Sequence, residues 1–274
     1  MAVDPIRPIR TAFIFQLLKL IRQSRESMVR NVRPLIISPS PLDIDELERA
    51  VELSLTRNLD IKGKAIVEMF LKLGFERGID YTVGRIEAEA PPAEARIVAG
   101  VDWTRPDMKA IDELSKLSLA DLKGINADLG RKVLRVIVED DKKGLGITRI
   151  AKDINEQFNK IGLPRAETIA RTSINQSYNR AAWERILKYA PFKMWIATVP
   201  SERTRDSHRR MHHVIVPADE PFEVPSFKAS PKGKTIPGCK MNYPGDVSFG
   251  PDLAQIISCR CSIGPKFTPG EKKK

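Results

Sequence analysis

Apolar residues recur at helical spacing through the first two-thirds of the chain. In the stretch PIRTAFIFQLLKLIRQSRESMVRNV, residues 8–32, the positions Phe13, Leu17, Leu18 and Ile21 share one helical face, and Lys and Arg occupy many of the others. Pro34 is expected to end this helix because proline cannot donate the next backbone hydrogen bond. The pattern predicts a basic amphipathic helix that packs on a partner protein rather than one that binds a membrane.

Two further helices are predicted before residue 80. After the break SPSPLD, Asp43 or Asp45 can cap a second helix that runs to about residue 57. A third apolar-periodic stretch covers about residues 62–75. Residues 87–102, EAEAPPAEARIVAGVD, are small and Pro-rich, which is typical of a linker.

The pattern is helical again from Leu114 to about residue 190. The last helix is long and is opened by Pro164, which suits a first helical turn. Arg171, Asn175 and Asn179 form a polar line along it at i, i+4 and i+8. After residue 191 the pattern changes to short apolar runs such as KMWIATV between Gly, Pro and Ser, which predicts short strands and loops.

These elements predict an α+β protein whose N-terminal two-thirds are mostly helical and whose C-terminal domain is small and made of strands and loops. Four segments are expected: a helical region 1–100, a second helical region 101–191 that ends in the long helix, a C-terminal domain 192–268 and a charged tail 269–274.

Charge favours a polyanionic partner. The chain has 274 residues, a net charge of +11 and a pI near 9.6, and its last 84 residues carry 14 Lys and Arg against 8 Asp and Glu. Nucleic acid is the leading candidate, although a basic surface alone is weak evidence. No secretory signal or membrane-spanning run is expected, and an odd number of cysteines, three, fits a reducing compartment or metal binding.

Two basic stretches are candidates for DNA contact. Residues 144–174 match a helix-turn-helix pattern, but any helical hairpin with a Gly-containing turn does so. The stretch SERTRDSHRRMHH, 201–213, holds Arg203, Arg205, Arg209 and Arg210, whose guanidinium groups can grip phosphates. The alternative is that these arginines brace backbone carbonyls in a loop-rich domain.

Every histidine and every cysteine lies between residues 208 and 261. Zinc takes four sulfur or nitrogen ligands, and a loop-rich segment gains order from such a clamp. The predicted ligands are His208, Cys259 and Cys261, with Cys239, His212 or His213 as the fourth. The spacing CxC is less common than CxxC, so buried free cysteines are the alternative interpretation.

The order of several short motifs resembles the head-morphogenesis family of tailed phages typified by the F protein of phage Mu. The similarity covers roughly residues 120–265, and the first 110 residues lie outside it. The matching residues are Arg171–Thr172 in IARTS, Trp195 in MWIATV, Arg203–His208 in RTRDSH, Phe222 in DEPF, Pro237–Gly238 in IPG, Tyr243 to Asp246 in NYPGD, and Cys259, Arg260 and Cys261 in CRC.

This resemblance implies that RTRDSH and CRC meet in the core of one small domain, with Arg203, Arg205, His208, Cys259 and Cys261 as its framework. It also implies a minor head protein of a tailed phage or prophage, located in the virion at the portal vertex or head interior and in the host cytoplasm during assembly. Its expected partners are the portal protein, the major capsid or scaffold protein and non-specific double-stranded DNA, with a role in head assembly, packaging or genome ejection.

Three positions depart from the family pattern. Ser173 and Ser201 stand where the family has Glu and Asp, and His213 stands where a Gly is usual. Loss of both acids predicts a structural or binding role and no enzymatic activity. The alternative function is a metal-dependent hydrolase or nucleic-acid-modifying enzyme that uses His208 with Cys259 or Cys261.

Overall fold

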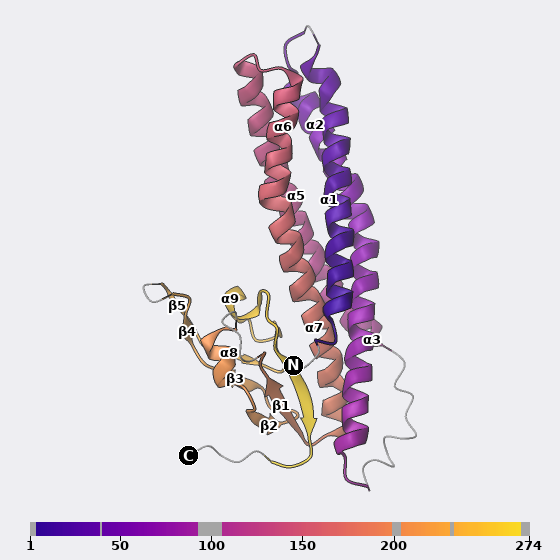
Figure 1. Ribbon diagram of the computed structural model, residues 1–274, viewed down its shortest axis with the longest axis vertical. Coiled ribbons are helices and arrows are strands. Elements are labelled where there is room, and N and C mark those ends of the chain that lie inside the picture. Colours follow the sequence, from indigo (N-terminus) through magenta and orange to yellow (C-terminus); the bar gives the residue numbers. More distant parts are fainter. Residues whose placement is uncertain (1–3, 39, 93–105, 199–203, 231–232, 270–274) are drawn as a thin grey trace. The chain divides into compact units, whose positions relative to one another are not determined.

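The computed structural model describes residues 4–38, 40–92, 106–198, 204–230 and 233–269, and it confirms the α+β fold class (Figure 1). Among the described residues up to 189 the regular structure is helical, and strands begin at residue 192. The described part of the chain holds no helix with the length and apolarity that crossing a bilayer requires.

The packing of the chain forms two compact units. The first unit, called the helical unit below, contains residues 10–69 and 115–170; the second, called the C-terminal unit, contains residues 1–9, 70–114 and 171–274. The helical unit is built from α1 (Arg7–Ile36), α2 (Ile44–Leu55), η1 (Thr56–Lys62), α6 (Ile147–Gln157), η2 (Phe158–Gly162), and parts of α3 (Gly63–Glu89), α5 (Met108–Lys142) and α7 (Leu163–Tyr189).

Helix α1 buries the apolar face that its sequence predicts. Phe13, Leu17 and Ile21 are buried and Leu18 is half-buried, so the chain's own helices cover most of this face. The prediction that Pro34 ends the helix was wrong, because α1 continues to Ile36. A proline so near the last turn removes only one hydrogen bond, since few residues remain to be disturbed.

The second predicted helix is confirmed, and Asp43 caps it by accepting a hydrogen bond from the Glu46 amide at 3.1 Å. The helix-turn-helix interpretation of residues 144–174 was wrong. Helix α6 passes into α7 through the π-helical segment η2 without a turn. Gly162 lies in η2 instead of a turn, where a Cβ atom would come within 2.9 Å of the Ile21 side chain, so glycine allows α1 to approach closely.

The C-terminal unit combines helical segments with three small sheets. Strands β2 (Ile215–Pro217), β1 (Phe192–Ile196) and β7 (Ser262–Lys266) form one antiparallel sheet in that order, with Trp195 opposite Ile263. Strand β3 (Phe222–Val224) pairs with β6 (Cys239–Met241), and β4 (Phe227–Lys228) pairs with β5 (Thr235–Ile236). These strands confirm the predicted strand-and-loop composition of residues 192–268.

The core of this unit joins α7 to the strands. Trp195 lies at its centre and meets Phe222 edge to face at 5.2 Å between ring centroids. The remaining members come from α7, the strands and the loops between them: Ala182, Ile186, Ala190, Ala197, Met211, Ala218, Val224, Met241, Tyr243, Ile256, Cys259, Cys261 and Ile263. Both cysteines of CRC are therefore core residues.

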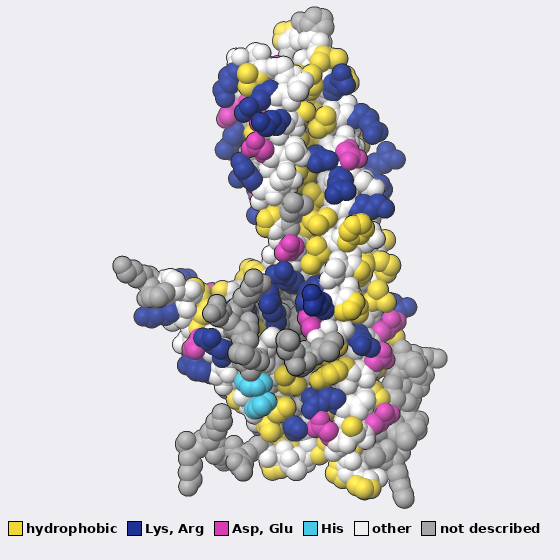
Figure 2. Space-filling model, in the orientation of Figure 1, with side chains coloured by type: hydrophobic (Ala, Val, Ile, Leu, Met, Phe, Trp, Pro, Cys, Tyr) yellow, Lys and Arg dark blue, Asp and Glu magenta, His cyan; other side chains and the backbone are white. Residues whose placement is uncertain are grey.

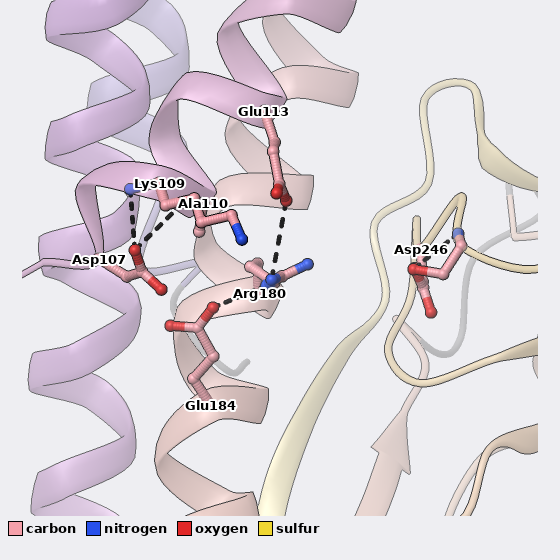
Figure 3. Close-up of polar contacts among 8 residues, drawn as sticks. Asp107, Lys109, Ala110, Glu113, Arg180, Glu184 and Asp246 are labelled. Carbon is pink, nitrogen blue, oxygen red and sulfur yellow. Dashed lines mark hydrogen bonds and ion pairs between the residues drawn. The ribbon is translucent and has the colours of Figure 1, made fainter.

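Polar contacts order the helical part of this unit (Figure 3). The Asp107 carboxylate caps α5 by accepting from the amides of Lys109 at 2.8 Å and Ala110 at 3.2 Å. Arg180 on α7 donates to Glu184 one turn later at 2.7 Å and lies 3.9 Å from Glu113 of α5. These contacts tie α5 to α7 within the unit.

Candidate metal centre

The structure brings His208, Cys259 and Cys261 together in one buried cluster. His208 lies on the short helix α8 (Asp206–Arg210), and the two cysteines lie between α9 (Leu253–Ile256) and β7. The His208 Nδ1 atom is 3.4 Å from the Cys259 Sγ and 3.5 Å from the Cys261 Sγ, and the ligand atoms all lie within 4.8 Å of one another. This confirms that RTRDSH and CRC meet, as the resemblance implied.

The backbone before Cys259 is held in an unusual conformation. Ser258 has a φ of +56°, in the left-handed region that costs a non-glycine residue about 1 kcal/mol or more. Its amide donates to the Thr172 Oγ1 on α7 at 3.0 Å, and the Thr198 hydroxyl donates to the Arg260 carbonyl at 3.0 Å. Contacts on both sides therefore fix the direction in which CRC enters the core.

The cluster is almost fully removed from solvent. His208 is 1 % exposed, Cys259 4 % and Cys261 1 %, and the ring of Trp195 meets that of His208 edge to face at 5.3 Å. In this part of the structure the His208 Nε2 and Trp195 Nε1 atoms are buried without a hydrogen-bond partner among the described residues. The site is therefore a buried cluster of two thiols and one imidazole.

The two thiols have opposite tendencies to ionise. Hydrogen bonding from Cys261 lowers the pKa of Cys259 well below its ordinary value, and the neighbouring His208 lowers it further against the effect of burial. The pKa of Cys261 is raised because its proton is held by Cys259 and because burial disfavours a second thiolate. The Cys261 amide also points at the Cys259 sulfur, at 3.4 Å. One thiolate is thereby favoured at this position.

Gln255 is a bracing residue that the sequence did not reveal. Its side chain is fully buried, and its amide nitrogen donates to the carbonyls of Pro237 at 3.1 Å and Pro225 at 3.3 Å. Its amide oxygen accepts from the Ser207 hydroxyl at 3.2 Å, next to His208. Gln255 therefore links α8 and α9 to two loops, and no local pattern distinguishes such a glutamine from an exposed one.

Helix α7 holds the CRC and NYPGD segments through buried amides. The Asn179 side chain donates to the carbonyls of Pro244 at 3.1 Å and Cys261 at 2.9 Å, and Gln176 donates to that of Gly245 at 2.9 Å. Gly245 has a φ of +92°, which explains why NYPGD contains a glycine there. Part of the polar line predicted along this helix thus contacts the cluster's own loop.

Tyr243 and Asp246 of the same motif are both buried. The Tyr243 ring packs 5.7 Å from Trp183, and the Asp246 carboxylate closes the turn by accepting from the amides of Asn242 at 2.8 Å and Ser248 at 2.9 Å. Figure 3 shows Asp246 in this loop beside the helices. Their role in the described structure is to shape the loop. Arg171 and Arg260 are half-buried, and Ser173 is buried on α7.

The predicted DNA-contacting arginines are engaged within the domain. Arg205 donates to the Ile257 carbonyl, and Arg210 donates to that of Ser226 at 2.7 Å. Arg209 and Arg210 also lie 3.7 and 3.1 Å from the Asp206 carboxylate. These contacts match the alternative in which the arginines brace backbone carbonyls. Arg203 and Ser201 lie outside the described residues.

The candidates for a fourth ligand do not join the cluster in the described structure. Cys239 lies on β6, opposite Val224, and burial together with the charge of Asp252 raises its thiol pKa to about 11. The His212 Nδ1 accepts from the Ala197 amide at 3.1 Å, and its ring stacks on that of His213 at 3.7 Å. Among the described residues, the group that can hold a metal therefore has three members.

Comparison with known proteins identifies the class of this region. Residues 131–263 match the family described as phage Mu protein F like protein, which confirms the resemblance implied by the motifs. Over these residues the match supports a phage head-morphogenesis protein of the Mu F-like family.

A relative named "Uncharacterized protein MJ0329", from Methanocaldococcus jannaschii, is 30% identical over 137 residues. The alignment covers 46% of this chain and 22% of the relative, so the chain spans about a fifth of that protein's length. No solved structure matches the chain.

Proposed function

We propose that the protein is a minor head protein, carried in the virion at the portal vertex of a tailed phage and acting in head assembly, DNA packaging or genome delivery. The observation that carries the proposal is the Mu F-like region itself. Residues from several motifs that are separate in the sequence are buried close together: Trp195, His208, Phe222, Tyr243 and the two cysteines of CRC.

The nature of the site favours a structural role over the alternative of a hydrolase. A metal-dependent hydrolase needs a ligand position that substrate and water can reach. Each of the three clustered side chains is at most 4 % exposed. We therefore assign to this domain a role in assembly, for which a rigid, cross-braced structure is sufficient.

The test of the proposed function is to locate the protein in particles. Purified virions, procapsids and DNA-free heads would be analysed by quantitative mass spectrometry, with the portal and major capsid proteins as internal standards. A small, constant number of copies per portal ring is expected, and crosslinks to the portal are expected in procapsids. Absence of the protein from both procapsids and virions would refute the proposal.

DNA contact is the second part of the proposal, and the structure supplies a better surface for it than the arginines of α8. Lys19, Arg22, Arg30 and Arg33 are exposed on α1, and at 100° per residue they fall within an arc of about 80° that extends for about 21 Å. Figure 2 shows Lys and Arg side chains spread over the helices of the helical unit. We call these four residues the α1 stripe.

The α1 stripe should bind duplex DNA through phosphates without sequence preference. Each neutralised phosphate contributes about −0.9 to the slope of log K against log salt concentration. Replacing all four residues by Gln should therefore flatten the slope by about 3 to 4. The matched variant Arg209→Gln/Arg210→Gln should change it by less, because both side chains already contact Asp206. An unchanged slope in the first variant would remove the stripe from the DNA surface.

A further inference from the structure

We propose that His208 Nδ1, Cys259 Sγ and Cys261 Sγ bind one zinc ion that holds α8 to the CRC segment. The proposal concerns the isolated protein and does not depend on its location in the virion. It rests on the spacing of the three atoms, on their burial and on the hydrogen-bonding capacity of the group.

The distances fit a shared tetrahedral ion. With Zn–S bonds of about 2.3 Å and Zn–N bonds of about 2.0–2.1 Å, tetrahedral angles separate sulfur from nitrogen by about 3.6 Å. The structure gives 3.4 and 3.5 Å from the same His208 Nδ1 to the two sulfurs. The cluster therefore already has nearly the spacing that zinc imposes.

Hydrogen bonding accounts less well for these distances. The Nδ1 atom of a histidine carries at most one proton, so it can make one good hydrogen bond and not two equivalent ones. Here it is nearly equidistant from two sulfurs, although a single proton would favour one of them. A cation at the centre would contact all three ligand atoms at once.

The surroundings suit an ion with thiolate ligands. The backbone amide of Cys261 points at the Cys259 sulfur, at 3.4 Å. Zinc sites commonly have such outer donors around their ligands. The three side chains offer one imidazole and two thiols. Nitrogen and sulfur ligands of this kind favour zinc over magnesium or calcium, which bind mainly oxygen ligands.

The fourth position of the tetrahedron has no protein ligand in the described part of the chain. An enclosed water molecule is therefore expected to complete the coordination, and because the three ligands are at most 4 % exposed, substrate could not reach that position. Cys239 is the natural control, because it is a cysteine of the same domain that stands outside the three-residue group.

The first experiment measures metal in the full chain, produced without a histidine tag and purified with reductant in metal-free buffers. Inductively coupled plasma mass spectrometry should find about one zinc per chain. Single variants Cys259→Ser and Cys261→Ser should each lose at least nine-tenths of it, whereas Cys239→Ser should retain it. Zinc lost from Cys239→Ser but retained in Cys259→Ser would overturn the assignment.

The second experiment uses the unaltered protein, so it does not depend on whether the variants fold. Exchange of zinc for Co²⁺ should produce visible bands of a four-coordinate ion and a sulfur-to-cobalt charge-transfer band in the near ultraviolet, with an intensity that indicates two thiolates. Wild-type protein with little zinc, no cobalt bands and three freely reactive thiols would overturn the proposal. A Cys259–Cys261 disulfide in protein purified with reductant would overturn it equally.

Discussion

Replacement of Lys193 by methionine should stabilise the protein. Lys193 lies on β1, is completely buried, and has no hydrogen-bond partner for its Nζ atom among the described residues. Its ammonium lies 5.3 Å from the Phe222 ring centroid and 5.9 Å from that of Trp183. Burial lowers its pKa from 10.5 to about 8, although the charges of Asp246, Asp219 and Glu220 oppose the change.

The magnitude follows from that pKa. A lowering from 10.5 to about 8 corresponds to about 3 kcal/mol against the folded protein wherever the lysine is charged in both states. Below pH 8 this cost is present in full. Between pH 8 and 10.5 the unfolded state binds more protons than the folded state, so stability should rise with pH, and above that range the cost disappears. Lys193→Met keeps most of the length of the side chain and removes the charge.

The assay is urea unfolding from pH 7 to 10.5, followed by tryptophan fluorescence. The variant should be more stable than the wild type by about 1–3 kcal/mol at pH 7, and the difference should shrink toward zero by pH 10.5. Other titrating groups cancel because they are common to both proteins. Lys228→Met, at an exposed position on β4, should show no such trend. A variant less stable than the wild type at pH 7, or a difference independent of pH, would refute the reasoning.

Two other substitutions test how the C-terminal unit is braced. Asn179→Ala should lower the free energy of unfolding by about 2–4 kcal/mol, because it leaves the buried carbonyls of Pro244 and Cys261 unpaired. Its control Asn175→Ala should lower it by about 1 kcal/mol, since the Asn175 amide nitrogen is already without a partner in the described structure. Gly78→Ala should lower Tm by several degrees, because the new Cβ would collide with the Tyr178 carbonyl and lie 2.9 Å from the Ala181 Cβ. Its control Gly84→Ala, with open space around the new Cβ, should be neutral or stabilise the protein by up to about 1 kcal/mol. Equal effects within either pair would contradict the corresponding packing argument.

The fold class could be predicted because its signals are local. Helical periodicity is a property of neighbouring residues, and α1 buries the positions that this periodicity selects. The short apolar run KMWIATV likewise indicated a strand, and in β1 Lys193 and Trp195 share one buried face. What strand alternation could not indicate is that a lysine would occupy the core position beside that tryptophan.

The errors in the sequence analysis have a common cause in tertiary packing. Gly162 reads as a turn residue, yet close packing against Ile21 and a π-helical segment keep the chain helical there. The opposite problem affects Gln255, whose three partners lie 18 to 48 residues away and leave no pattern in the sequence. The sequence predicted that histidine and cysteine would form the site, but not which of them. Cys239 lies within the same stretch of residues 208–261 and yet does not join the cluster of His208, Cys259 and Cys261.

Removal of the proposed zinc ion should disorder the C-terminal domain before the helices. Its strands are at most five residues long, and the two smaller sheets have only two strands each, so backbone pairing alone stabilises them weakly. Much of the order of residues 204–265 must therefore come from cross-links such as Gln255, Asn179 and the His208 cluster. Because ion binding and local folding are one equilibrium, chelation should speed hydrogen exchange in β1, α8 and the CRC segment, while α1 and α2 keep their protection. Hydrogen-exchange mass spectrometry with and without a chelator measures this directly, and Cys259→Ser should reproduce the pattern without chelator. Uniform loss of protection across the chain, or none at all in α8 and CRC, would show that the cluster does not hold the domain together.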